Sequence, residues 1–164
     1  MNIFVLHTNP TIAAHMYCDK HIPKMTVELY QQMGSAVIRY GATPEMMPLT
    51  KSGTPMKGGY HNHPCTRWCG ETRSNYDWAR QHAIALCKEY TKRYNKHHFC
   101  ESGIIQLSNM NRLIPTGDRT DFAQAMPDEH KQDDAVQAYR SYYHTKHFAK
   151  WERGRPKPDW FKGS

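Results

Sequence analysis

The stretch SNYDWARQHAIALCKEYTKRYNK, residues 74–96, carries the clearest helical pattern in the chain. Its apolar side chains recur every three or four residues, from Ala79 through Leu86 to Tyr94, which places them on one face of an α-helix. Ser74 and Asp77 resemble a capping box at its start. We therefore predict a central helix over residues 74–96.

Shorter helices are predicted on both sides of this segment. Asn9 is a good N-cap and is followed by Pro10 at the first helical position, so a short helix should follow. A second helix should begin near Pro23 and end near Gly34, with Met25 and Leu29 on its apolar face. Further helices are expected in residues 101–113 and 133–152. Acids at the start of the latter segment and lysines near its end suit the helix dipole.

The remaining stretches are rich in Pro and Gly and have no hydrophobic period. Residues 41–64 and 114–132 should be long irregular loops. Residues 2–6 could form at most one short strand. The fold class is therefore predicted to be mainly α, a single compact helical domain with long irregular loops over residues 1–153, followed by a basic aromatic C-terminal tail over residues 154–164.

Composition narrows the possible partners. The 164 residues carry a formal charge of +7, and the 25 residues from Arg140 to Ser164 hold seven Lys or Arg against two acids, which favours an anionic partner docked at this end. The five cysteines have no disulfide-framework spacing and should be reduced thiols in a cytoplasm. No apolar run reaches the roughly 18 residues that a membrane span requires. No P-loop, dinucleotide fingerprint or paired CxxC set is present, so no cofactor is predicted.

The stretch CDKHIPKMTVEL, residues 18–29, concentrates groups able to transfer protons. On a helix that begins near Pro23, Lys24 and Glu28 are four residues apart and can touch. They could be an ordinary ion pair on a solvated face. However, Asp19 and His21 lie at the same helix start, and together these residues offer acid, base and amine candidates for catalysis.

The stretch HNHPCTRWC, residues 61–69, contains four nominal zinc ligands. Pro64 stiffens its middle, and no second ligand pair with zinc spacing exists elsewhere, so no metal site is predicted. His61 and His63 would instead hydrogen-bond the core or a bound anion.

The C-terminal stretch AYRSYYHTKHFAKWERGRPKPDWFKG, residues 138–163, interleaves aromatic and basic residues. Rings can stack on bases while Lys and Arg neutralise phosphates, so the mixture suits nucleic acid. Tyr139 and Tyr143 are more typical of core positions. The candidates in the tail region are Arg153, Arg155, Lys157, Trp160 and Phe161.

Together these stretches resemble the pyrimidine dimer DNA glycosylases, the phage endonuclease V family. DKHIPKMTVEL supplies the family's Asp-x-His followed by Glu-Leu, as Asp19, His21 and Glu28. RPKPDWFK is similar to the end of the family's chains, and CKEYTKRYN to the end of their long helix. The whole sequence also resembles small phage-encoded proteins marked by CDKH, HNHP, MPDE and AYRSYY.

The resemblance implies a DNA-acting enzyme of the glycosylase type, an AP lyase as well, that removes or acts on a flipped pyrimidine base in duplex DNA in the host cytoplasm, if the chain is phage-encoded. Glu28 would stabilise the developing sugar cation, with His21 on the sugar-phosphate side. The family's nucleophile is an N-terminal α-amine. Here Met1 is followed by Asn2, which usually blocks methionine removal, so Lys24 is the alternative amine, provided that burial lowers its pKa.

Two further functions remain open from the sequence. The same scaffold could serve a transferase that modifies bases in phage DNA. A different class would be a non-catalytic, nucleotide-binding anti-defence protein, in which His61, His63, Arg140 and Lys146 form an anion clamp.

Overall fold

The computed structural model describes residues 2–163, within which six α-helices and no strands are found. The fold is mainly α, as predicted. The helices are α1 (Pro10–Met16), α2 (His21–Arg39), α3 (Pro64–Glu71), α4 (Arg73–Tyr94), α5 (Glu101–Ser108) and α6 (Ala135–Tyr143). Short 3-10 turns at Pro44–Met46, Asn111–Leu113 and Asp128–His130 punctuate the long irregular loops.

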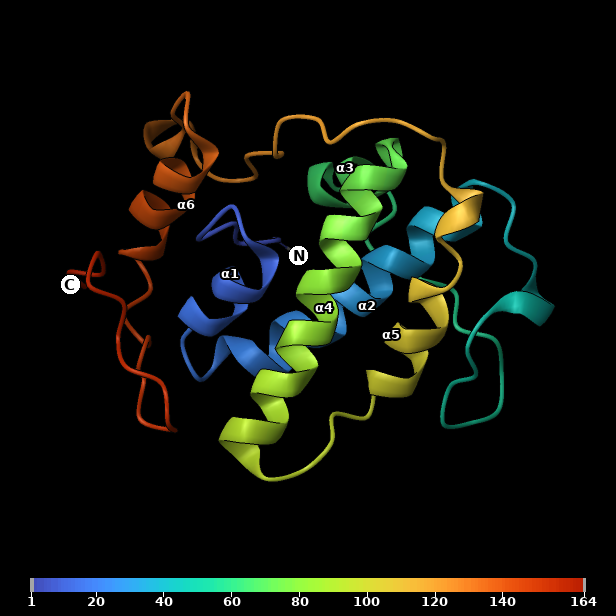
Figure 1. The fold of residues 1–164 in the computed structure, drawn as a ribbon, viewed down its shortest axis with the longest axis horizontal. Coiled ribbons are helices and arrows are strands. Elements are labelled where there is room, and N and C mark those ends of the chain that lie inside the picture. The colour runs from blue at the N-terminus through green and yellow to red at the C-terminus, as the bar shows by residue number, and fades with distance from the viewer. Residues whose placement is uncertain (1, 164) are drawn as a thin grey trace.

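Helix α4 is the centre of the packing, as the sequence predicted. It contacts α1, α2, α3 and α5, and it runs through the middle of the molecule with α1 on one side and α5 on the other (Figure 1). The cap is Thr72, whose side chain accepts from the backbone N–H of Asn75. The expected capping box at Ser74 and Asp77 is not used, since Asp77 bonds Arg80 and Asn111 instead.

Helix α2 starts two residues earlier than expected and continues through Gly34 to Arg39. Gly34 was predicted to end it. It is accommodated because Met56 from the following loop packs where a side chain at position 34 would lie. Helix α2 therefore forms a long second layer against α3, α4 and α5.

The N-terminal segment, residues 2–6, is buried from Ile3 to Leu6 and forms no strand, within the expectation of at most one. Side chains from other elements hold its backbone: the N–H of Phe4 donates to the Tyr17 hydroxyl at 2.9 Å, and the carbonyl of Leu6 accepts from Nε of Arg140 at 3.0 Å. These bonds satisfy the buried backbone without a sheet partner.

Two further boundaries differ from expectation. Residues 64–71 form α3 rather than part of a loop, with Pro64 at the first helical position and His63 as its N-cap. Helix α6 ends at Tyr143 rather than near residue 152. Beyond it the backbone bonds to Asp19: the carbonyl of Lys150 accepts from its N–H, and the N–H of Glu152 donates to its carboxylate. These tertiary bonds replace the helical ladder.

All five cysteines are unpaired thiols buried in the core. No helix among the described residues has the length and apolarity needed to cross a membrane.

Candidate functional site

His21, at the first position of α2, is buried and hydrogen-bonded to a residue 122 positions away. Its Nδ1 lies 2.8 Å from the hydroxyl of Tyr143 on α6. The same hydroxyl accepts the backbone N–H of Cys18 at 2.9 Å. Donation of its own proton to Nδ1 of His21 would place the proton of the imidazole on Nε2. His21 is thus a neutral ring with one N–H to donate.

Burial keeps this imidazole neutral. The His21 side chain is only 4% exposed, with its ring stacked on Phe4 at 4.9 Å between centroids. Burial, reinforced by the charges of Lys146 and Lys24, lowers the pKa of His21 to about 3. Lysines gathered around a neutral N–H donor are arranged for an anion, since the donor can bond the anion while they balance its charge.

Three aromatic rings near His21 lie against lysine ammonium groups. The Lys146 ammonium lies 4.0 Å from the centre of the Tyr142 ring and 5.7 Å from that of Phe4. Lys20 lies over Phe148 at 5.1 Å, and the Phe148 ring meets His21 edge-on at 5.2 Å. The cations are therefore held near the site rather than dispersed in solvent.

Glu28 lies two helical turns after His21 on the same side of α2, and it is half-buried. Lys24, between them, is exposed. The burial that would favour its role as the alternative amine is absent here, and that role stays a prediction. Met1, which carries the α-amine, lies outside the described residues.

Asp19 has a structural role, connecting three segments of the chain, rather than the role of an acid or base. Its carboxylate pairs with Arg93 at 3.2 Å and accepts the backbone N–H of Glu152 at 2.6 Å. Its carbonyl accepts from the hydroxyl of Tyr94 at 2.7 Å. These bonds join the start of α2 to α4 and to the segment after α6.

The tail packs against the helical domain through a buried carboxylate that the sequence did not single out. Arg155 binds Glu89 of α4 with both Nε and Nη2, at 3.1 and 2.9 Å. Arg93, one turn along α4, donates to the same carboxylate at 2.9 Å. Burial alone would raise the pKa of Glu89, but these arginines outweigh it and hold the pKa below its usual value. Arg155 therefore anchors the tail.

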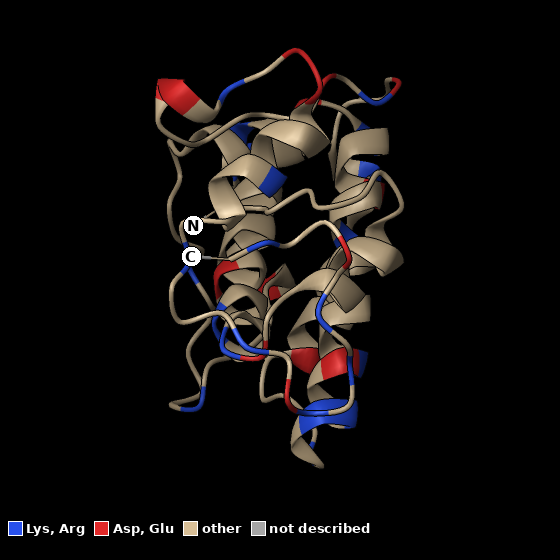
Figure 2. Ribbon diagram, turned by 90° about the vertical axis from the view of Figure 1, so that its left-hand side faces the viewer, with Lys and Arg blue, Asp and Glu red and all other residues tan. Residues whose placement is uncertain are grey.

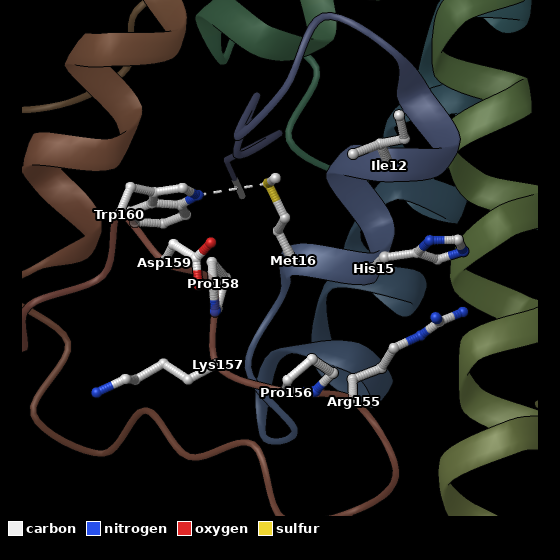
Figure 3. A pocket seen from close by; sticks show the side chains of 9 residues that line it. All are labelled: Ile12, His15, Met16, Arg155, Pro156, Lys157, Pro158, Asp159 and Trp160. Carbon is white, nitrogen blue, oxygen red and sulfur yellow. Dashed lines mark hydrogen bonds between the residues drawn. The ribbon is translucent and has the colours of Figure 1, made fainter.

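The tail and α1 enclose a pocket of about 410 Å³. Its apolar part is formed by Met16 and Trp160, whose indole N–H donates to the Met16 sulfur (Figure 3). Arg155 points toward α4, while Lys157 points the opposite way (Figure 3). Arg140 stacks over the Trp160 ring at 5.1 Å. Trp160 and Arg140 are thus brought together, and Lys157, which lines the same pocket as Trp160, is exposed.

Phe161 and Arg153 differ in what they offer a ligand. Phe161 is 7% exposed, because its ring packs against Trp151 and Tyr143. This burial removes it from the set of rings expected to stack on bases. Arg153 is exposed and lies over the Tyr94 ring at 4.4 Å. On the side of the molecule that carries the tail, Lys and Arg positions recur along the irregular segments in the lower half of the view (Figure 2).

The members of the expected anion clamp have separate surroundings. His63 caps α3, accepting the N–H of Cys65 on Nδ1, and burial lowers its pKa. The carbonyl of His61 accepts from Arg39. Arg140 bonds Leu6, and Lys146 lies on Tyr142. Among the described residues, no three His, Cys, Asp or Glu side chains gather as a metal site would require.

The residues that sequence reasoning missed act through tertiary contacts. Tyr143 was expected at a core position, and Glu89 had no signal beyond its place in the central helix. Lys20 and Phe148 had only their place in basic or aromatic stretches as a signal. Nothing in the local pattern tells these residues apart from others of their kind.

A family model described as pyrimidine dimer DNA glycosylase matches residues 1–102. The matched segment contains His21, Lys24 and Glu28 but neither α6 nor the tail. No curated protein and no solved structure matches the chain.

Proposed function

The chain belongs to the pyrimidine dimer DNA glycosylase family, and we propose that it removes a pyrimidine base from duplex DNA at the face of α2 that carries His21 and Glu28. Membership supports a glycosylase-type activity on DNA at the level of the family. One observation supports base removal at this face in particular. The neutral His21, with lysines near it, lies on the same side of α2 as the half-buried Glu28 carboxylate.

The proposed reaction is cleavage of the glycosidic bond. The bond between C1′ and the base nitrogen breaks, the electron pair leaves with the base, and positive charge develops on the sugar. The carboxylate of Glu28 stabilises that charge and accepts the proton of the attacking water or amine, which bonds to C1′. The base must first leave the stack, since its glycosidic bond is enclosed in a duplex.

His21 and the lysines hold the neighbouring phosphate in this proposal. The Nε2–H of His21 donates to a phosphate oxygen, while Lys24 and Lys146 balance its charge. A neutral donor keeps the same hydrogen bond from pH 5 to 8, because its pKa of about 3 lies far below that range. The imidazole is therefore a positioning group, and its charge does not change during turnover.

The C-terminal region extends the proposed contact along the strand. Lys157 and Arg153 are exposed and available to phosphates, and Trp160 presents a half-buried ring beside Arg140. Arg155 contributes by fixing the tail through Glu89. Neutralising Lys157 or Arg153 should remove about one phosphate contact in each case. The slope of the logarithm of the binding constant against the logarithm of the salt concentration should then become shallower by about one for each variant.

Base release tests the proposal. The protein is incubated with ultraviolet-irradiated and with undamaged duplex, and cleavage of glycosidic bonds is measured. We expect cleavage only in irradiated DNA, and Glu28→Gln should reduce its rate about 100-fold or more. Glu129→Gln, at a carboxylate that is 77% exposed, is the matched control and should retain full rate. Equal rates for the two variants would refute the role of Glu28.

Borohydride trapping separates the possible nucleophiles. A covalent protein–DNA adduct indicates attack by an amine and hence lyase chemistry, and an adduct that persists in Lys24→Arg excludes Lys24 as that amine. Base release without an adduct indicates attack by water. An altered base that stays attached to the sugar would contradict the glycosylase proposal and support the transferase.

A further inference from the structure

A second open groove is lined in part by Phe148, whose ring packs against His21. The groove measures about 710 Å³ and is lined by Asp19, Lys20, Tyr94, Phe148, Lys150, Glu152 and Arg153. Phe148 is 41% exposed, and its ring meets that of His21 in a T-shaped contact at 5.2 Å. The groove therefore adjoins the proposed glycosylase site at Phe148.

The groove combines flat stacking surfaces with positive charge. The guanidinium carbon of Arg153 lies 4.4 Å from the centre of the Tyr94 ring, which also stacks on Tyr90 at 5.1 Å. Lys20 lies over Phe148, and Lys150 is exposed beside it. Aromatic rings and guanidinium planes stack on bases, while the ammonium groups suit the phosphates between them.

The floor of the groove is rigid and its acids are largely balanced. Asp19 is bonded to Arg93 and to the backbone of Glu152, and its own N–H and carbonyl are bonded to Lys150 and Tyr94. Its charge is therefore compensated from inside the protein. Glu152 is the other acid in the lining, against the three cations Lys20, Lys150 and Arg153.

We propose that this groove binds an unpaired DNA strand that continues from the duplex held at His21. Within a duplex the faces of each base are covered by neighbouring bases, so the stacking surfaces of the groove can be used only by bases that have left the helix. The volume suits a splayed segment of strand rather than a double helix. The inference rests on the proposed function for its choice of DNA and for the duplex at His21.

Tailed and blunt duplexes test this inference. Fluorescence anisotropy with the full chain gives dissociation constants for a blunt duplex and for the same duplex with about six unpaired thymidines at one end. We expect the unpaired tail to tighten binding by about tenfold, and Phe148→Ala or Arg153→Gln to remove most of that ratio. Phe99→Ala and Lys51→Gln are matched controls, because Lys51 lies over the exposed Phe99 ring at 5.4 Å outside the groove. They should leave the ratio unchanged.

The outcomes separate the two proposals. Equal affinity for blunt and tailed duplexes overturns the groove proposal while leaving the glycosylase proposal intact. If no base is released but the unpaired tail still tightens binding, and the groove variants still remove that effect, then the glycosylase proposal fails and the groove proposal stands. Competition by free thymidine 5′-phosphate as effective as that by a thymidine hexamer would mark a mononucleotide site and would overturn the strand proposal.

Discussion

The hydroxyl of Tyr143 accepts the N–H of Cys18 and lies 2.8 Å from Nδ1 of His21. We predict that it donates to Nδ1, so that Nε2–H remains for a ligand. A Phe ring would keep the packing of Tyr143 against Phe4 and Phe161. It would leave the backbone N–H of Cys18 and Nδ1 of His21 without their hydrogen-bond partner. The role of Tyr143 is therefore separable from its volume.

Tyr143→Phe should lower the free energy of unfolding by about 1–3 kcal/mol, because it leaves the buried N–H of Cys18 and Nδ1 of His21 without a hydrogen-bond partner. Urea denaturation measures this loss. Nitrogen-15 NMR of the His21 ring should show the Nε2–H tautomer in the wild type and a mixture in the variant. Tyr40→Phe, at an exposed position, is the control and should change neither. An unmixed Nε2–H tautomer in Tyr143→Phe would contradict the assignment.

At the same scale, the sequence located His21 and Glu28 but not the groups that control them. Their spacing on one helix is local and therefore visible in the sequence. Tyr143 is 122 positions from His21, and its hydroxyl could have bonded to any nearby partner. The same limit applies to Phe161, whose burial depends on Trp151 and Tyr143 meeting it in space.

At the scale of elements, Glu89 joins three segments of the chain. Its carboxylate binds Arg93 on α4 and Arg155 in the tail, and His15 of α1 lies 3.7 Å away. The carboxylate is 3% exposed. A buried charge of this kind is stabilised only while its partners remain, so its removal leaves the buried Arg93 side chain with less compensation.

Glu89→Gln should therefore destabilise the protein by about 3–5 kcal/mol. The same change should release the tail, which hydrogen exchange at residues 156–163 would detect as lost protection. Asp77→Asn removes the partly exposed Asp77–Arg80 pair on the same helix. It should cost no more than about 1 kcal/mol and leave the tail protected. A tail that stays protected in Glu89→Gln would show that Arg155 does not anchor it.

The helices themselves were predictable where the signal is local. Asn9 caps α1 through the N–H groups of Thr11 and Ile12, with Pro10 behind it, as its sequence indicated. Helix α3 had a local signal in Pro64, which suits a first helical position, but the histidines and cysteines around it also fit a loop. The end of α6 had none, because the segment beyond it is recruited by Asp19.

At the scale of the whole molecule, two histidines tie folding to pH. His82 of α4 is fully buried between the carbonyl of Pro10 and the hydroxyl of Tyr17. Burial lowers its pKa to about 4, and burial lowers that of His21 to about 3. Both values lie below the value of about 6.5 for histidine in an unfolded chain. Folding therefore requires both rings to be neutral.

The free energy of unfolding should consequently fall as the pH is lowered from about 6.5 to about 5. In that range the unfolded chain binds protons at these two positions and the folded protein does not, so each histidine contributes a slope approaching 1.4 kcal/mol per pH unit. The stabilising effect of Glu89 has a different window, since its lowered pKa makes that effect disappear only below about pH 4.5. Urea denaturation at several pH values measures the slope. His82→Gln should reduce the slope by up to about 1.4 kcal/mol per pH unit, whereas His97→Gln, at a ring that is 81% exposed, should leave it unchanged. A slope that His82→Gln does not alter would mean that His82 is protonated in the folded protein, which its two buried hydrogen bonds argue against.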